Sequence, residues 1–312
     1  MPRLIETDTD EAIELGDLVE MLETQPFDGR DQDCFASWGP QLKKLANNRR
    51  FLGDIVVAEL KGRCHEQLTR NQYSPQVIVL HTSGNRFLLR ANFWPALNDS
   101  VVRQTGTAPF FYGLAHDHNF SFLTVGYVGS GYWSDYYEYD YDQVVGFAGE
   151  KVDLRFVERS RLEQGKVMLY RAHLDVHKQL PADDMSVSIN IMEGNHAAPF
   201  RNQYGFDVDE GLITGPVEAL PIQQLIMMAA HFAGDEGRDL VTEFADHHPS
   251  DPIRLQAVRA GASTLPNVDA RIEYFARATA GDNRYISEMA KQEIAKLEMS
   301  RAWIERSPIP HA

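Results

Sequence analysis

The feature that most constrains the fold is a change in hydrophobic period along the chain. In the middle of the sequence the period shortens, and short runs such as 76–81 and 86–93 are strand-like and are separated by the turn sequence Thr82-Ser-Gly-Asn. Gly, Asp and Asn stand in most gaps between the runs that follow, at 109–114, 119–128, 132–140, 151–158, 166–171 and 185–192. Many short strands with no helix between them predict an all-β sandwich or barrel here.

Helical periodicity flanks this region on both sides. Before it, Leu15, Leu18 and Leu22 recur at roughly helical spacing, and residues 41–67 repeat that character. After about residue 218 several helical patterns follow, of which the last, 283–304, contains neither Gly nor Pro. We therefore predict an α+β protein with three regions: an N-terminal helical region 1–72 packed on the barrel, a β-barrel 73–217 that carries the functional site, and a C-terminal helical bundle 218–312.

Composition excludes several classes of function. Hydrophobic residues make up 43% and charged residues 24%, which is ordinary for a globular protein. The net charge of −15, with no Lys/Arg-rich stripe, argues against nucleic acid as a partner. No apolar run approaches the roughly 18 residues that span a bilayer, so no membrane is expected. The acidic N-terminus shows no signal peptide, and Cys34 and Cys64 make no disulfide framework, so we expect a cytoplasmic protein.

The segment His116-Asp-His118 is the most informative in the chain. Residues i and i+2 of a strand point to the same face, so both imidazoles are expected on one side. Two neutral imidazoles on a rigid strand form half of a site for Fe, Mn, Ni, Cu or Zn.

A second histidine segment follows about fifty residues later. Gly165 opens a turn, and a short strand then leads to His173 and His177, before the strand pattern that begins at Ser186. This arrangement is expected to return the chain to the barrel beside the first pair. His177 is the candidate third ligand. His173 shares its face if both lie on one extended strand, and it is then an alternative ligand or a catalytic acid or base beside the metal.

These two segments resemble the two sequence motifs of the cupin superfamily. In the first, His116 and His118 form the His-x-His pair; in the second, Gly165 precedes His177, which stands one residue beyond the family spacing. The resemblance implies a double-sheet jelly-roll barrel. The glutamate of the first motif is absent, because Phe122 stands near its place.

A site with histidine ligands alone resembles the thiol dioxygenase branch of the cupins, represented by cysteine dioxygenase. In that branch an arginine upstream of the histidine pair binds the substrate carboxylate, and Arg90 or Arg86 matches this description. The branch also carries a tyrosine after the last strand, where Met192-Glu-Gly-Asn stands here. Tyr127 and Tyr112 are the other candidates for a hydroxyl at the site.

These observations lead to one functional hypothesis with alternatives. Three neutral ligands leave open positions on iron(II) where a small polar, amino-acid-like substrate and O₂ can both bind. We therefore expect an iron(II)-dependent dioxygenase, although Zn, Mn and Ni also suit the ligands. The alternatives are a Zn or Mn isomerase or hydrolase, and a ligand-binding or regulatory module without catalysis. A homodimer, if one forms, is expected to use the helical regions.

Overall fold

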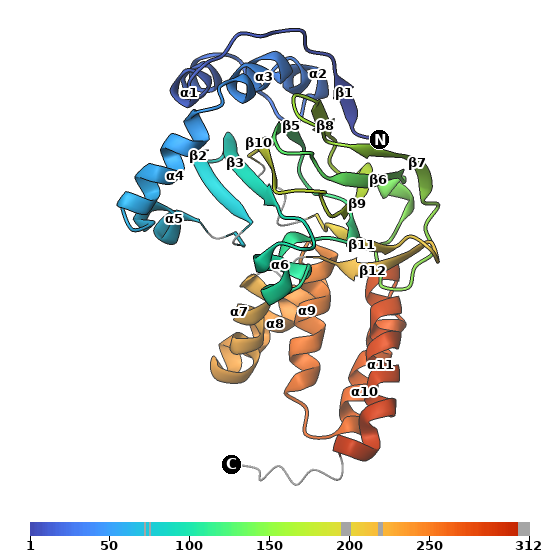
Figure 1. Cartoon of the computed structure of the whole chain (residues 1–312). Coiled ribbons are helices and arrows are strands. Elements are labelled where there is room, and N and C mark those ends of the chain that lie inside the picture. The colour runs from blue at the N-terminus through green and yellow to red at the C-terminus, as the bar shows by residue number, and fades with distance from the viewer. Residues whose placement is uncertain (72, 75, 195–200, 218–220, 305–312) are drawn as a thin grey trace. The chain divides into compact units, whose positions relative to one another are not determined.

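The computed structural model describes residues 1–71, 73–74, 76–194, 201–217 and 221–304 (Figure 1). The chain divides into two compact units. The first comprises Met1–Tyr141, Val152–Ala198 and Gly205–Gly211, and the second comprises Asp142–Lys151, Pro199–Tyr204 and Leu212–Ala312. The three predicted regions have no direct counterpart in this division and stay a prediction.

The first unit opens with one short strand and a set of helices. The polar side chain of Asp31 caps the second helix, because it accepts hydrogen bonds from the backbone N–H groups of Asp33 and Cys34. In chain order these elements are β1 (Arg3–Ile5), α1 (Leu15–Thr24), α2 (Gln32–Ala36), α3 (Gly39–Asn47), α4 (Phe51–Lys61) and α5 (His65–Arg70).

Short antiparallel strands form the rest of this unit, as the alternating pattern predicts. They are β2 (Val77–Ser83), β3 (Phe87–Trp94), β4 (Ala115–His116), β5 (Phe122–Val128), β6 (Trp133–Glu138), β7 (Arg155–Arg161), β8 (Val167–Tyr170), β9 (Asp175–Leu180), β10 (Ser186–Glu193) and β11 (Tyr204–Asp207). The short helices α6 (Ser100–Thr105), η1 (Ala108–Phe110) and η2 (Tyr141–Gln143) interrupt them.

The strands form two sheets. The first has the order β1-β8-β5-β10-β3-β2, and the second contains the order β11-β4-β9-β6-β7. From β3 to β10 the chain passes repeatedly from one sheet to the other, with only β6 and β7 consecutive in one sheet. The named strands of the two sheets share no ladder in the part of the chain that the structure describes. The fold is therefore α+β with two antiparallel sheets.

The central strands of the first sheet are buried on both faces. The odd-numbered residues of its central strands, such as Leu89, Leu123 and Ile189, belong to one apolar cluster with residues of α1 to α4. The even-numbered residues face the other way and form a second cluster with Tyr132 and Tyr136 of the second sheet. All eight residues of β10 are buried as a result. This inner face bounds the space between the two sheets.

One expected strand is absent. The run 109–114 is instead the 3₁₀ turn η1 followed by a loop, in which Phe111 and Gly113 have φ of +58° and +81°. Pro109 has no N–H to donate to a strand ladder, and positive φ is incompatible with an extended strand. The prediction of a strand at this point is wrong, and β4 begins only at Ala115.

The second unit is mainly helical. Its apolar core includes Ile226, Val241, Leu255, Phe275 and Ile286. Its elements are β12 (Leu212–Pro216), α7 (Pro221–Phe232), α8 (Gly234–His247), α9 (Asp251–Ser263), α10 (Val268–Thr279) and α11 (Arg284–Ile304). Among the described helices of the whole chain, none has the length and apolar character needed to cross a membrane.

Candidate metal centre

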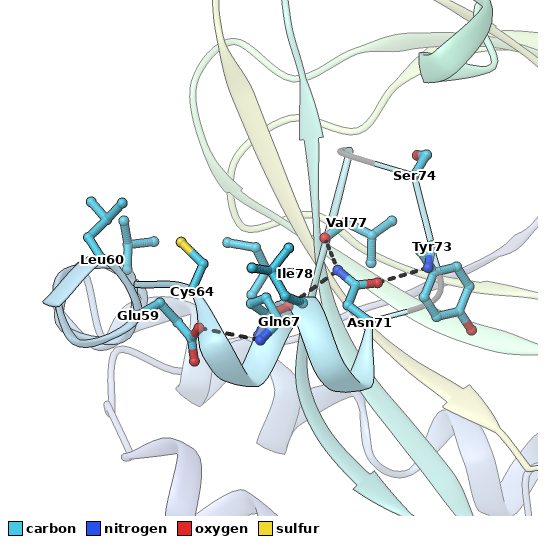
Figure 2. A pocket seen from close by; sticks show the side chains of 11 residues that line it. Glu59, Leu60, Cys64, Gln67, Asn71, Tyr73, Ser74, Val77 and Ile78 are labelled. Carbon is cyan, nitrogen blue, oxygen red and sulfur yellow. Dashed lines mark hydrogen bonds between the residues drawn. The ribbon is translucent and has the colours of Figure 1, made fainter. Parts of the chain in front are cut away.

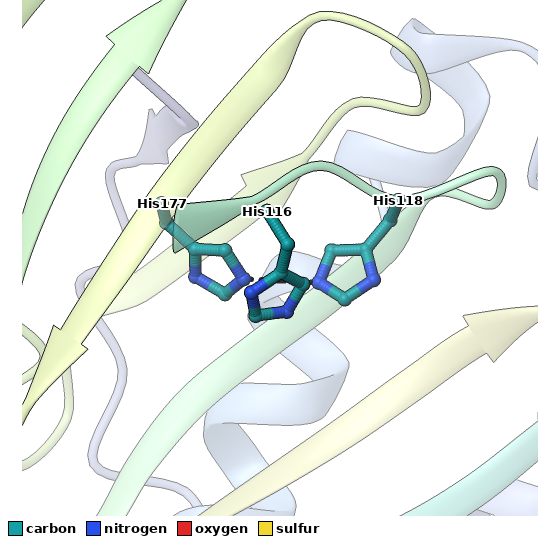
Figure 3. A group of neighbouring side chains, drawn as sticks. All are labelled: His116, His118 and His177. Carbon is teal, nitrogen blue, oxygen red and sulfur yellow. Dashed lines mark hydrogen bonds between the residues drawn. The ribbon is translucent and has the colours of Figure 1, made fainter. Parts of the chain in front are cut away.

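Three histidines converge on the inner side of the second sheet (Figure 3). His116 ends β4 and lies directly opposite His177 of β9 in the antiparallel register. Opposite residues of an antiparallel pair point to the same face, so this pairing brings the two imidazoles together. His118 lies two residues beyond His116, in the loop that follows β4.

The spacing of the donor atoms suits one metal ion. One ring nitrogen from each of the three histidines lies within 4.8 Å of the others. The Nε2 atoms of His118 and His177 are 3.0 Å apart. Two ligands at metal bonds of about 2.1 Å are separated by about 3.0–3.4 Å when they occupy adjacent octahedral or tetrahedral positions. The residues present therefore fit a mononuclear site.

Hydrogen bonding and burial prepare the imidazoles for this role. His116 Nδ1–H donates to the Leu114 carbonyl at 3.0 Å, which leaves Nε2 with a free lone pair. Burial lowers the pKa of His116 to about 4. Burial, together with the neighbouring His116 and His118, lowers the pKa of His177 well below its ordinary value. Near pH 7 both rings are neutral, as metal ligation requires.

The structure separates the two candidates for the third position. His173 does not share a strand with His177, because it has φ of +59° in the turn before β9. It is not part of the group of converging donor atoms. Its Nδ1 lies 3.9 Å from the Asp117 carboxylate, and its ring lies 4.1 Å from that of Tyr141. The reading of His173 as an alternative ligand on a shared strand is therefore corrected.

His173 instead helps to join the segment 116–118 to the turn before β9. Its backbone N–H donates to the His118 carbonyl at 2.8 Å. The buried Asp117 carboxylate, between the two ligands in sequence, accepts a 2.6 Å hydrogen bond from the Tyr139 hydroxyl. Ala172 N–H also donates to Ser121 Oγ. These contacts hold the His116–His118 segment against the turn that leads to His177.

Aromatic residues from both sheets enclose the histidines. The ring of Phe122, on the inner face of the first sheet, lies 5.0 Å from that of His118. The Tyr170 ring lies 5.0 Å from that of His177, and its hydroxyl pairs with that of Tyr136 at 2.8 Å. Burial raises the pKa of Tyr136 to about 12, so its hydroxyl stays protonated. Protonated hydroxyls therefore lie beside the candidate ligands.

Arg90 also lies on the inner face, as its even position in β3 dictates. It is opposite Asn190 of β10, which in turn is opposite Thr124 of β5. The Thr124 hydroxyl donates to Asn190 Oδ1 at 2.7 Å. Asn92, two residues along β3, is 6% exposed, and its Oδ1 has no hydrogen-bond partner in the described structure. The inner face thus presents polar groups that a ligand can satisfy.

Two of the other candidate residues, Tyr127 and Arg86, lie elsewhere, whereas the third, Tyr112, belongs to the inner-face cluster with its hydroxyl already bonded to the backbone. Tyr127 has an odd position in β5, belongs to the apolar cluster with the N-terminal helices, and donates its hydroxyl to the Asn48 carbonyl at 3.0 Å. Its prediction as a site hydroxyl is therefore corrected. Arg86 binds Glu23 at 3.0 Å, and the Tyr112 hydroxyl donates to the Pro95 carbonyl at 2.9 Å. Of the two arginines, only Arg90 is on the inner face.

A separate pocket of about 390 Å³ lies between α4, α5 and the edge strand β2 (Figure 2). The Gln67 side chain donates to the Val79 carbonyl and accepts from its N–H, so it occupies part of the open strand edge. The Asn71 side-chain NH₂ group donates a hydrogen bond to the Val77 carbonyl of the same strand. None of the three histidines lines this pocket.

Sequence reasoning missed two inner-face residues beside the histidines. Tyr170 is at an even position of β8, and alternation along that strand was the available signal. Gln179 is two residues after His177 on β9, so it shares the same face. Its Nε2 lies 3.4 Å from His177 Nε2. The sequence did not define β9 as a separate strand, so the shared face of His177 and Gln179 could not be predicted from it.

No protein-family model matches the sequence, and no curated protein matches it. Solved structures that resemble it include a cupin-like protein from Thermotoga maritima, which is 13% identical, with 46% of this chain and 77% of that chain covered and a TM-score of 0.23. Hydroquinone 1,2-dioxygenase from Sphingomonas sp. TTNP3 is 8% identical, with 41% and 72% covered and a TM-score of 0.26.

A structure from a study of DMSP lyases is 11% identical, with 39% of this chain covered and a TM-score of 0.22. This chain spans only 44% of the length of that structure. TM-scores of 0.22 to 0.26 are too low to assign this chain a family or a function.

Proposed function

We propose that the protein is a mononuclear iron(II)-dependent oxygenase that acts on a small, polar, amino-acid-like substrate. The observation that carries this proposal is the convergence of three buried imidazoles, from His116, His118 and His177, within 4.8 Å. Ring nitrogens of buried histidines that face one another stabilise the fold little when no cation is present. A shared metal ion accepts a lone pair from each of the three rings.

The strand order supports a cupin-type jelly roll for the domain that holds this site. The first sheet contains β8-β5-β10-β3 and the second contains β4-β9-β6-β7. Eight strands distributed over two sheets in this alternating way are the arrangement of two Greek keys in a jelly roll. The histidines then lie between the sheets, which is where a barrel interior offers a shielded site.

The neutral donor set favours iron(II) and an anionic substrate. Three imidazoles leave the full +2 charge on the ion, so a thiolate or carboxylate is attracted to it. A bound iron(II) ion would supply the open positions and the one-electron chemistry that O₂ needs. The thiol dioxygenase branch shares this set of ligands, and we extend the proposal to thiol-containing amino-acid-like substrates.

The residues of the chain around the histidines supply binding and orientation. Arg90 has an inner-face position in β3, and its guanidinium lies 5.1 Å from the centre of the Tyr73 ring; we propose that it binds the substrate carboxylate in a bidentate manner. Tyr136 and Tyr170, with their paired hydroxyls, are hydrogen-bond donors beside His177. Phe122 packs against His118 and reduces the access of water to that ring.

Metal analysis of the purified protein, followed by oxygen-electrode assays with thiol and amino-acid substrates, tests the proposal. We expect about one iron per chain and substrate-dependent O₂ consumption, both lost in His118→Ala. An exposed histidine provides the matched control: His247→Ala, on α8 of the second unit, should retain both.

The results also separate the alternatives. Stoichiometric zinc or manganese, with no O₂ consumption, would replace the proposal with an isomerase or hydrolase. A folded chain that binds no divalent metal would favour a ligand-binding module. Oxygen consumption that persists in His118→Ala without metal would contradict the iron site itself.

A further inference from the structure

One residue beside the histidines has buried polar atoms that the three-histidine site leaves unexplained. Gln179 is 4% exposed and lies on β9, two residues after His177 and on the same face. Its Nε2 is 3.4 Å from His177 Nε2, the atom that approaches His118. Its Oε1 has no hydrogen-bond partner among the described residues. An unsatisfied buried acceptor lowers the stability of the folded protein.

The position of the amide suits a neighbouring place in one coordination sphere. A separation of 3.4 Å from His177 Nε2 lies within the range of about 3.0–3.4 Å between adjacent ligands on metal bonds of about 2.1 Å. The two Nε2 atoms of His118 and His177, at 3.0 Å, lie in the same range. The end of the Gln179 side chain is thus spaced from His177 as a further ligand would be.

A rotation of 180° about the bond to the Gln179 amide group exchanges the positions of Oε1 and Nε2. A bound cation favours one of these two orientations. With a divalent ion on the histidines, an NH₂ group at this place would direct its positive hydrogens toward the ion. The carbonyl oxygen would direct its negative dipole there instead. Ser134, opposite Gln179 on β6, is 0% exposed and its Oγ has no partner in the described structure. It offers an acceptor for the displaced NH₂.

We propose that Gln179 supplies its Oε1 as a fourth protein ligand to the metal held by His116, His118 and His177. Amide oxygens are accepted ligands of hard divalent cations. A neutral fourth ligand keeps the charge of the site at that of the ion, so the preference for an anionic substrate is retained. This inference rests on the proposed metal site but adds a residue that the histidine motifs do not contain.

Titration of metal-stripped protein with Co²⁺ and Zn²⁺, in competition with a chelator, tests the role of Gln179. We expect Gln179→Leu to weaken binding by about 10–100-fold, the loss seen when groups that support a metal site are removed. Gln179→Glu, which keeps an oxygen donor, should bind at least as tightly as the wild type. The Co²⁺ visible spectrum should change in Gln179→Leu and not in the control variant Gln76→Leu.

The matched control is Gln76→Leu. Gln76 is also 4% exposed, and its Nε2 lacks a partner in the described structure, but it precedes β2 in the other sheet. It should bind both metals like the wild type. Equal affinity of Gln179→Leu and Gln76→Leu would overturn the inference while the histidine site stands. A wild-type protein that binds neither ion would overturn the proposed function instead.

Thermal unfolding provides a readout that is independent of the titration. Metal-free Gln179→Leu should be at least as stable as the metal-free wild type, because an unsatisfied buried oxygen has been removed. Its increase in Tm on addition of Zn²⁺ should be smaller, because the stabilisation of the folded state by a ligand grows with the logarithm of the ratio of free ligand concentration to Kd. An unchanged metal-dependent increase in Tm would contradict the role of Gln179.

Discussion

The outer and inner faces of the first sheet are made by the same strands, yet they bury different chemistry. On the outer face, Leu89, Leu123 and Ile189 belong to one buried apolar cluster with residues of the N-terminal helices. On the inner face of the same strands lie Arg90, Thr124 and Asn190. The alternation of a strand places these two sets one residue apart.

The difference separates stability from function. An apolar face buried against helices contributes roughly 1.5–3 kcal/mol for each large side chain removed from water. The inner face also buries apolar residues such as Phe122 and Met168, but its polar residues offer no such gain, and unsatisfied atoms among them, such as Asn92 Oδ1, reduce stability. Buried polar atoms without partners on one face of a sheet are available to form hydrogen bonds with a ligand there. The comparison can be tested by changing each face in turn.

The largest effect is expected on metal binding when an inner-side ligand is removed. His177→Ala should weaken Zn²⁺ binding by well over about 100-fold, since the loss of groups that merely support a site costs 10–100-fold. Metal-free stability should fall less than in the outer-face variant Leu123→Ala, because the cavity that forms replaces a polar ring whose Nδ1 has no partner in the described structure. Calorimetric titration and urea unfolding measure the two effects. A strongly destabilised metal-free variant would remove the distinction between the faces.

Leu123→Ala, on the outer face, should produce the largest loss of stability. Leu123 is fully buried in the cluster beneath the N-terminal helices, so a cavity remains, and the free energy of unfolding should fall by about 2–5 kcal/mol. Leu97→Ala, at a side chain that is 56% exposed, is the control and should cost far less. The folded fraction of Leu123→Ala should still bind metal normally; altered affinity would show that the faces are coupled.

The pH dependence of stability should reveal the buried histidines of the inner side. Burial lowers the folded-state pKa of His116 to about 4, whereas unfolded histidine titrates near 6.5. In metal-free protein the contribution of His116 to the free energy of unfolding is fully present above about pH 6.5. It is lost as pH falls toward 4, because the unfolded chain binds protons at a higher pH than the folded chain does. His116 alone accounts for about 3 kcal/mol of this loss.

Urea unfolding of metal-free protein between pH 7.5 and 4.5 measures this dependence. His116→Gln should flatten it, and His81→Gln, on the exposed edge strand, should not. A wild-type stability that stays constant over this interval would mean that the imidazoles are charged or exposed in the folded protein.

The smallest effects distinguish two tyrosines on opposite faces. Tyr136→Phe removes the hydroxyl pair with Tyr170, and Tyr127→Phe removes the hydrogen bond to Asn48, so each should cost about 1 kcal/mol of stability. Only Tyr136→Phe should also lower the rate of substrate-dependent O₂ consumption. Steady-state assays with both variants test this, and equal rates would show that the inner hydroxyls do not take part.

The alternating apolar pattern predicted most of the sheet. The strands at 77–83, 87–94 and 186–193 match the expected runs closely, and in the last of them the apolar Val187, Ile189 and Ile191 alternate with Ser186, Ser188 and Asn190 at a period of two. The pattern failed at 109–114, where Pro109 and the positive φ of Phe111 form a turn. Phe110 and Tyr112 of that segment are buried without belonging to a strand ladder. The hydrophobic period alone does not distinguish a buried strand from a buried turn.

The choice of functional residues shows the same limit. His116 and His118 were identified from two positions on one side of a strand, but only His116 is in β4 and His118 follows it in a loop. Tyr127 was selected for its hydroxyl, yet its odd position places it among apolar residues. Which parity faces the interior depends on which elements cover each side of the sheet, and this is a property of the assembled fold.

The sequence by itself determined the α+β organisation, the order of helical and strand regions, and the two histidine segments, because local periodicity and turn residues are written into neighbouring positions. The tertiary structure alone decided that His177 rather than His173 joins the pair, and that Gln179 lies beside it. The physical reason is register. His177 meets His116 only because β9 pairs with β4 at that residue, and a shift by one would turn its side chain to the other face.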